Sequence, residues 1–339
     1  MTTPCLTALK VAYPHSEITM VVNQGTEDMV RDNPCLAEVI TLEREPQKRF
    51  WEELGYQRKL IAQLREKRFD LSIDFSGGDR GAILSWLSGA KERIGYHPRK
   101  GKQWWWKKAF TRTVQTPGDD RHVVEHHLDA LRELGINPAK HPLGFYWTIT
   151  DQESLSRILA QKGQEMGNPY IVVHPTSRWM FKTWRLEGYT QVIDYLQGDL
   201  GYSVLVTSGP EEKELKAVSE IIGQCRTKPI DLSGQLSLKQ LGCLIAGGKI
   251  FFGVDSAPMH MAAAVGRPVL ALFGPSGDHM WGPWGEGHLV LKKDWSCRPC
   301  GQDGCEGSKI SRCLQEITEE EVISGLETLL KTSTPPTSA

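Results

Sequence analysis

The 339-residue chain lacks several features that assign proteins to common classes. No run of about 18 apolar residues is present, so the sequence contains no candidate membrane-spanning helix. The formal net charge is −1, which gives the chain no overall attraction to nucleic acid. The first residues show neither a basic start nor an apolar core, so we expect no secretory signal and a cytoplasmic location.

Two enzyme signatures are also missing. No GxGxxG pattern follows a strand-like segment, which argues against a dinucleotide-binding dehydrogenase. His122 and His126 have a spacing that can bind zinc, but they form no HExxH pattern and no third ligand is evident. We therefore interpret these histidines as packing or solvated residues.

The eight cysteines indicate free thiols or metal ligands, because a long chain without a secretory signal rarely carries a disulfide framework. Four of them lie close together in the sequence and can in principle hold a tetrahedral zinc ion. Their spacing departs from paired CxxC knuckles, so a structural zinc site and a reduced, metal-free loop both remain open. These four are Cys297, Cys300, Cys305 and Cys313.

Strand-like apolar segments alternate with amphipathic helical segments along the whole chain. This alternation predicts an α/β protein with doubly wound parallel sheets. We expect a first domain over residues 1–150 and a second over 151–316. We expect the helix over 317–331 to return to the first domain, and the Pro/Ser/Thr-rich tail over 332–339 to be disordered.

Residues 247–276 carry the clearest local pattern. Lys249–Val254 predicts a buried strand, Val269–Phe273 predicts the next strand, and a helix capped by Ser256 should lie between them. Ligands bind at the carboxyl ends of parallel strands, and a helix N-terminus at that edge attracts phosphate. An ordinary strand-to-helix turn is the alternative explanation.

Two further predicted strands end in polar residues. The strand over 169–174 is followed by the hydroxyls of Thr176 and Ser177 and by Lys182, which suit a diphosphate. The strand over 202–207 is followed by acidic residues that either hold a ribose or simply begin a helix. These acidic residues are Glu211 and Glu212.

Residues 91–112 combine basic side chains with three consecutive tryptophans. Basic residues attract anionic surfaces and tryptophan favours the membrane interface, so we expect this segment to contact an anionic, lipid-anchored acceptor. Stacking on nucleic-acid bases and burial of the tryptophans in the core are the alternatives. The residues assigned to this contact are Arg99, Lys100, Lys102, Trp104, Trp105, Lys107 and Lys108.

The strings HPTSR with KTW, TSGPEE, DLSGQLSL, and GVDSAPMHMAAA with LFGPS together resemble the ADP-heptose:lipopolysaccharide heptosyltransferases of glycosyltransferase family 9. The resemblance covers nearly the whole chain and implies a GT-B fold, in which two Rossmann-like domains face each other across a cleft. It implies inverting transfer of heptose from ADP-L-glycero-D-manno-heptose to a heptose of the lipid-A-anchored inner core of lipopolysaccharide. It also implies peripheral association with the cytoplasmic face of the inner membrane, no required cofactor and no nucleic acid.

The resemblance also implies a donor site. Lys182, Thr176 and Ser177 would contact the diphosphate, and Asp255 would hold heptose hydroxyls. The remaining implied contacts are Glu211 or Glu212 to the ribose, Leu236 to the adenine, and Ser256, Ala257, Met259 and His260 at the phosphate-binding helix start.

Family members begin with a strand, a glycine-containing loop and an Asp that serves as the general base, and this sequence starts just after that segment. We therefore expect the first strand and its Asp to be absent, and Asp79 in SGGDRG to be the candidate replacement. Two other functions stay open: a nucleotide-sugar-binding protein without transferase activity, and a GT-B sugar-nucleotide epimerase.

Overall fold

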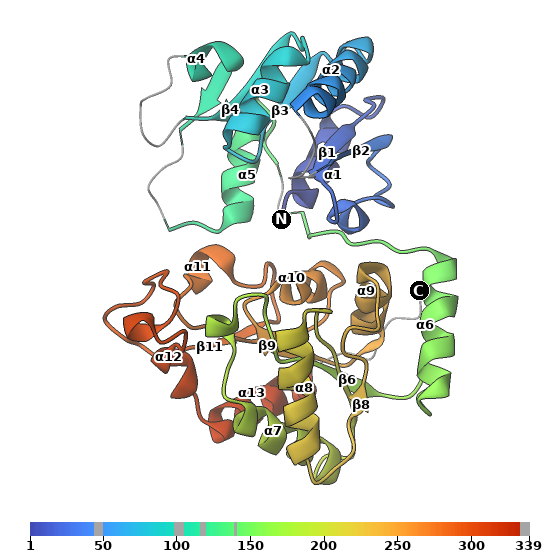
Figure 1. The fold of residues 1–339 in the computed structure, drawn as a ribbon, viewed down its shortest axis with the longest axis vertical. Helices are drawn as coiled ribbons and strands as arrows, with labels where there is room; N and C mark the ends of the chain where they lie inside the picture. The colour runs from blue at the N-terminus through green and yellow to red at the C-terminus, as the bar shows by residue number, and fades with distance from the viewer. Residues whose placement is uncertain (44–49, 98–104, 116–119, 139–140, 333–339) are drawn as a thin grey trace. The chain divides into compact units, whose positions relative to one another are not determined.

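A computed structural model describes residues 1–43, 50–97, 105–115, 120–138 and 141–332. The chain forms two compact units (Figure 1). The N-terminal unit consists of Met1–Glu27 and Cys35–His141, and the C-terminal unit consists of Asp28–Pro34 and Pro142–Ala339.

The N-terminal unit contains two separate parallel sheets, a two-stranded sheet β1-β2 and a three-stranded sheet β3-β4-β5. Apolar residues of β2 and α2 pack together in one of its cores. The elements are α1 (Thr3–Ala12), β1 (Thr19–Asn23), β2 (Glu38–Leu42), α2 (Phe50–Glu66), β3 (Leu71–Ile73), α3 (Asp79–Leu87), β4 (Glu92–Tyr96), α4 (Trp106–Ala109), β5 (Arg112–Val114) and α5 (Val123–Arg132), and the 3-10 helix η1 (Glu27–Met29) spans the boundary between the units.

The tryptophan-rich segment contributes to the core of this unit. Trp106 is 3% exposed, packs with Ala82 and Phe110, and donates its indole N–H to the carbonyl of Tyr96 at 2.9 Å. For Trp106, burial in the core is therefore the right explanation. Trp105 packs half-buried beside it, and Lys108 is exposed. Arg99, Lys100, Lys102, Trp104 and the side chain of Lys107 lie outside the described part of the chain.

The C-terminal unit contains one six-stranded parallel sheet, with the strand order β11-β10-β9-β6-β7-β8. Figure 1 shows helices on both faces of this sheet. The strands are β6 (Tyr170–His174), β7 (Ser203–Val206), β8 (Ile230–Asp231), β9 (Phe251–Val254), β10 (Val269–Leu272) and β11 (Leu289–Leu291). The helices are α6 (Ile149–Gln161), η2 (Met180–Lys182), α7 (Leu186–Gly198), α8 (Glu212–Gln224), α9 (Leu238–Gly247), α10 (Ala257–Ala264), α11 (Asp278–Trp281), η3 (Cys305–Gly307), α12 (Arg312–Gln315) and α13 (Glu319–Thr332).

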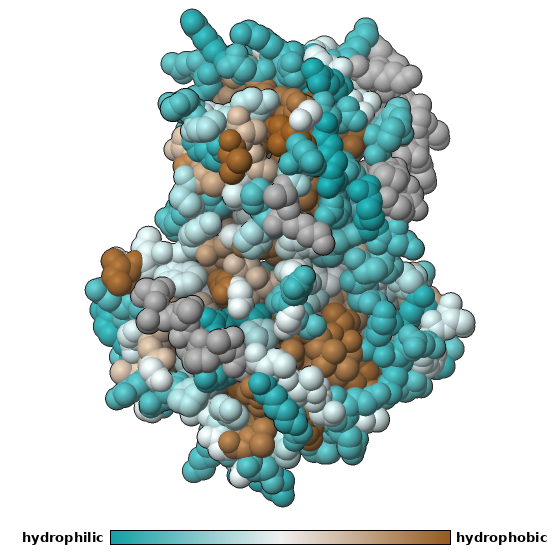
Figure 2. Space-filling view, turned by 180° about the vertical axis from the view of Figure 1, so that it is seen from behind, coloured by the Kyte–Doolittle hydropathy of each residue, from teal (hydrophilic) through white to brown (hydrophobic). Residues whose placement is uncertain are grey.

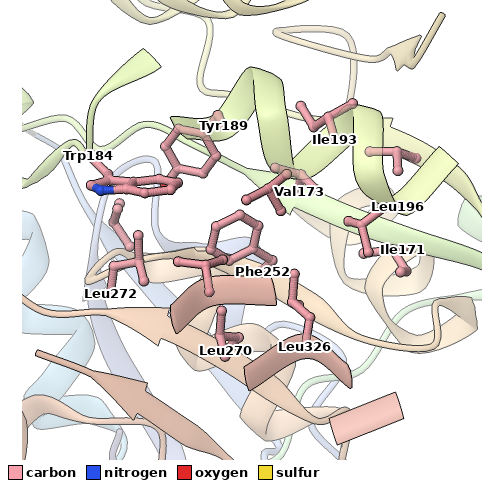
Figure 3. Packing of buried hydrophobic residues seen from close by; sticks show 14 of the residues in the cluster. Ile171, Val173, Trp184, Tyr189, Ile193, Leu196, Phe252, Leu270, Leu272 and Leu326 are labelled. Atoms are coloured by element: carbon pink, nitrogen blue, oxygen red, sulfur yellow. The ribbon is translucent and has the colours of Figure 1, made fainter. Parts of the chain in front are cut away.

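Successive strand residues point to opposite faces, so each strand contributes to two separate cores. Ile171 and Val173 of β6 pack with α7, α8 and α13, while Tyr170 and Val172 pack with α6, α9 and α10. Figure 3 shows the first core, where Trp184 and Tyr189 lie against Phe252 of β9. The strands are thus buried on both sides, as the apolar runs in the sequence predict.

The final helix, α13, lies on the sheet of the C-terminal unit, which differs from its predicted return to the first domain. It packs against β10, β11 and α7. The physical reason is its apolar stripe of Val322, Leu326 and Leu329, which completes the core on this face. Residues 333–339 of the predicted tail lie outside the described residues.

On the face that Figure 2 shows, hydrophilic side chains predominate and separate apolar areas lie among them. Among the large apolar side chains that are exposed in the N-terminal unit, Trp51 and Leu54 belong to α2, and Ile83 and Trp86 belong to α3. In the described ranges, no helix has the length and apolar character needed to cross a membrane.

Candidate functional site

The candidate site lies at the carboxyl edge of the C-terminal sheet. Val173 of β6 is in register with Phe252 of β9 on one side and with Val206 of β7 on the other. The loops that follow these strands therefore emerge at the same edge. The chain order reverses between β6 and β9, and such a switch point is where open α/β sheets bind ligands.

Lys182 and Asp255 meet at this switch point. The ammonium nitrogen of Lys182, in η2, donates to Oδ2 of Asp255 at 2.6 Å. The two side chains are 22% and 10% exposed. Because an ammonium group has three donors, Lys182 keeps two for a further acceptor. The pair can thus hold an anionic group while the carboxylate fixes the position of the cation.

The start of α10 is organised differently from the predicted cap. Ser256 occupies the N-cap position, but its side chain makes no capping hydrogen bond. Its Oγ is buried and has no hydrogen-bond partner among the described residues. A helix N-terminus with an unused hydroxyl favours an anionic ligand.

The other residues predicted at this helix start have different environments. Ala257 is exposed and His260 is half-buried. Met259 is fully buried and packs in the core of the sheet, because it lies on the inward face of α10. Because the side chain of Met259 packs in the core, the predicted contact of Met259 with a ligand would have to come from its backbone.

Thr176 and Ser177 follow β6 and are both buried. The hydroxyl of Thr176 donates to Oε2 of Glu214 at 2.8 Å, and the hydroxyl of Ser177 accepts from the amide of Trp179 at 3.3 Å. The hydroxyl of Thr176 therefore donates its hydrogen bond within the protein and not to a ligand. Sequence reasoning missed this role of Glu214, and the only local signal was the acidic start of α8.

The residues predicted to hold the nucleoside lie further along the same edge. Glu211 is the N-cap residue of α8 and Glu212 is its first residue, and both are exposed. Leu236 follows β8 and packs half-buried against the core. Their nucleoside contacts remain predictions.

His174, the last residue of β6, is a second residue that sequence reasoning did not single out. It is 4% exposed, and its Nδ1 lies 2.9 Å from the hydroxyl of Thr207. Burial lowers the pKa of His174 to about 4, so the ring is neutral at physiological pH. The ring thus supports the strand end without adding charge.

The N-terminal unit presents two carboxylates near the end of β3. Asp79, the predicted base, is the exposed first residue of α3. Asp74 is buried, and its Oδ1 accepts hydrogen bonds from the amide and hydroxyl of Ser76 at 2.9 and 2.6 Å. Its Oδ2 is buried with no partner in the described part of the chain, and burial raises the pKa of the Asp74 carboxyl.

The clustered cysteines all lie within the described residues as free thiols. No group of three or more metal-ligating side chains is gathered anywhere in that part of the chain. The cysteine loop is instead fastened to the loop after β10, since the amides of Cys300 and Gly301 both donate to the carbonyl of Pro275. Arg298 adds hydrogen bonds to the carbonyls of Gly274 and Lys293.

Sequence comparison identifies the relatives of the chain. The model of glycosyltransferase family 9 (heptosyltransferase) matches residues 57–311. Lipopolysaccharide heptosyltransferase 3 of Escherichia coli is 32% identical, over 100% of this chain and 97% of that protein. Lipopolysaccharide heptosyltransferase 1 of Pseudomonas aeruginosa is 27% identical, over 90% of this chain and 83% of that protein.

Comparison with solved structures identifies the fold. A family 9 glycosyltransferase of Veillonella parvula has a TM-score of 0.83 and 25% identity, with 98% of this chain and 93% of that chain covered. The ADP-heptose lipopolysaccharide heptosyltransferase II of E. coli has a TM-score of 0.74 and 23% identity, with 98% and 94% covered. The fold is therefore of the GT-B class.

Proposed function

Because the chain belongs to glycosyltransferase family 9, the heptosyltransferase family, we propose that it transfers heptose from ADP-L-glycero-D-manno-heptose to a heptose of the lipopolysaccharide inner core. The single observation that carries the chemistry is the Lys182–Asp255 pair at the switch point, beside the hydroxyl of Ser256, which has no hydrogen-bond partner among the described residues. A cation, a free hydroxyl and a helix N-terminus at one edge suit a diphosphate.

The proposed reaction is a direct displacement with inversion. The acceptor hydroxyl oxygen bonds to the anomeric carbon of heptose, and the bond from that carbon to the β-phosphate oxygen breaks. ADP departs with the electron pair, and a base takes the hydroxyl proton. Lys182 and the N-terminus of α10 stabilise the charge that grows on the diphosphate. Asp255 would hold heptose hydroxyls in addition to its ion pair with Lys182.

The base is proposed among the two carboxylates of the N-terminal unit. Asp79 is exposed, and its selection rests on the sequence. Asp74 is favoured by its buried Oδ2, which has no partner in the part of the chain that the structure describes, and by its raised pKa. Both bring Asp74 closer to the properties of a proton acceptor near neutral pH. Asp74→Asn and Asp79→Asn, assayed for transfer at saturating donor, would separate the two, since only the loss of the base lowers kcat by orders of magnitude.

The acceptor is proposed to reach the enzyme at the cytoplasmic face of the inner membrane. Support comes from the basic residues within 91–112, whose positive charge attracts an anionic lipid surface. The exposed apolar residues Trp51 and Leu54 of α2 lie in the same unit. A structural zinc ion at the four clustered cysteines remains a separate prediction.

A transfer assay tests the proposed function. The purified protein is incubated with ADP-heptose and an inner-core acceptor that lacks the added heptose, and the products are weighed by mass spectrometry. We expect the acceptor to gain one heptose with the wild type and with the control K216M, whose lysine is exposed on α8. Binding of ADP-heptose without any transfer would favour a binding protein, and isomerisation of ADP-heptose without acceptor would favour an epimerase.

A further inference from the structure

Glu214 has an environment that its place in the sequence does not require. It is the third residue of α8, where an acidic side chain usually stays in solvent near the positive end of the helix. Here it is only 4% exposed. Burying a carboxylate is unfavourable unless hydrogen bonds compensate, so its partners show what the burial achieves.

The partners of Glu214 belong to two different strand-end loops. Its Oε2 accepts the hydroxyl of Thr176, after β6, at 2.8 Å and the amide of Gly209, after β7, at 3.3 Å. One carboxylate oxygen thus connects the loop after β6, which carries Thr176, to the loop that leads to Glu211 and Glu212. Gly209 is suited to this approach, because a Cβ there would lie 2.9 Å from Oε1 of Glu214.

We propose that Glu214 is a positioning residue for the nucleotide half of the donor, an inference that rests on the proposed function. Glu214 holds the two loops at the spacing that the ADP group requires and does not touch the ligand. Thr176 then acts on the diphosphate through its backbone, because its hydroxyl already donates a hydrogen bond to Glu214. Contact with the ribose is left to the exposed Glu211 and Glu212.

The test compares E214A, E214Q and the control E220A, which changes an exposed glutamate of the same helix. ADP binding is measured by calorimetry, transfer by steady-state kinetics and folding by thermal unfolding. We expect E214A to weaken ADP binding and raise KM for ADP-heptose about tenfold, the size of one charged hydrogen bond, with a smaller change in kcat. E214Q should recover most of the affinity because its amide oxygen still accepts both hydrogen bonds, and E220A should match the wild type.

A double-mutant cycle with T176V asks whether Glu214 acts through Thr176. If it does, E214A/T176V should bind ADP no more weakly than the weaker single variant. Wild-type affinity in a folded E214A, or fully additive losses, would overturn the proposal. If E214A does not fold, E214Q and T176V carry the test, and a T176V protein with wild-type ADP affinity would overturn it.

The two proposals fail in different ways. An active wild type with an unaffected E214A would remove only the positioning role. A wild type that neither binds ADP nor transfers heptose would instead remove the proposed function.

Discussion

Lys182 and Asp255 are 73 residues apart in the sequence, and their side chains form an ion pair of 2.6 Å at the carboxyl edge of the sheet. The pair connects the loop after β6 to the loop after β9, across the point where the strand order reverses. The carboxylate orients the ammonium group, and the ammonium group holds the carboxylate in place.

Replacing Lys182 should impair catalysis more than folding. We expect K182M to lower kcat/KM for ADP-heptose by roughly a hundredfold or more, because a cation that faces a developing charge is lost. D255N should lower it as well, since the lysine loses its fixed partner. Steady-state kinetics against K216M check this, and wild-type kcat/KM in K182M would contradict the role of the lysine.

Replacing Ser256 should lower the transfer activity without lowering the stability of the fold. Its buried Oγ makes no hydrogen bond to the described residues, so S256A removes no internal bond and should leave the free energy of unfolding unchanged or raise it by up to about 1 kcal/mol. Transfer should fall about tenfold because the ligand loses a donor. The control S219A alters an exposed serine of α8. A destabilised but fully active S256A would mean that the hydroxyl serves the fold.

His174 should make the C-terminal unit less stable in acid. Its pKa is lowered to about 4 in the folded chain and is about 6.5 when unfolded, so between these values only the unfolded chain takes up the proton. The free energy of unfolding should therefore fall as the pH drops from 6.5 towards 4, by about 2 kcal/mol at pH 5. Denaturant unfolding at pH 7.5 and pH 5 should show a smaller loss for H174Q than for the wild type and the exposed-site control H15Q. Equal losses in all three would show that His174 is not the cause.

Chelation should leave transfer intact. In the proposed reaction, Lys182 and the N-terminus of α10 supply the positive charge that stabilises the leaving diphosphate, so EDTA should not change kcat. The same samples, analysed for zinc by mass spectrometry and for the thermal midpoint, test the cysteine cluster separately. A loss of activity that magnesium restores would refute the metal-free mechanism, whereas a loss of bound zinc with a lower midpoint would support the structural zinc prediction.

Reversing basic charges within 91–112 should weaken binding to anionic vesicles. At about 1 kcal/mol for each basic residue near a membrane, R99E/K100E/K102E should lose roughly a hundredfold in affinity for phosphatidylglycerol vesicles in a sedimentation assay. K162E/K216E/K331E carries the same change of charge at exposed positions of the C-terminal unit. Equal losses in both variants would mean that net charge alone governs binding.

Local sequence patterns were sufficient for much of the fold. The strands predicted over 249–254 and 269–273 are present as β9 and β10, and the strand and helix order of the C-terminal unit follows the alternation of apolar runs and amphipathic segments. These signals are local, because the side chains of a strand or helix repeat with the period of that element. The family resemblance was likewise carried by short strings at strand ends.

Contacts between distant residues needed the folded chain. The partners of Thr176 and Lys182, the burial of Met259 and the unused hydroxyl of Ser256 follow from which strands are neighbours and how each helix is rotated against the sheet. Asp32, 207 positions before Lys239, pairs with it at 2.7 Å because residues 28–34 belong to the C-terminal unit. One sequence carries the period of each element but not the pairing between elements, and that pairing is set by the packing of the whole sheet.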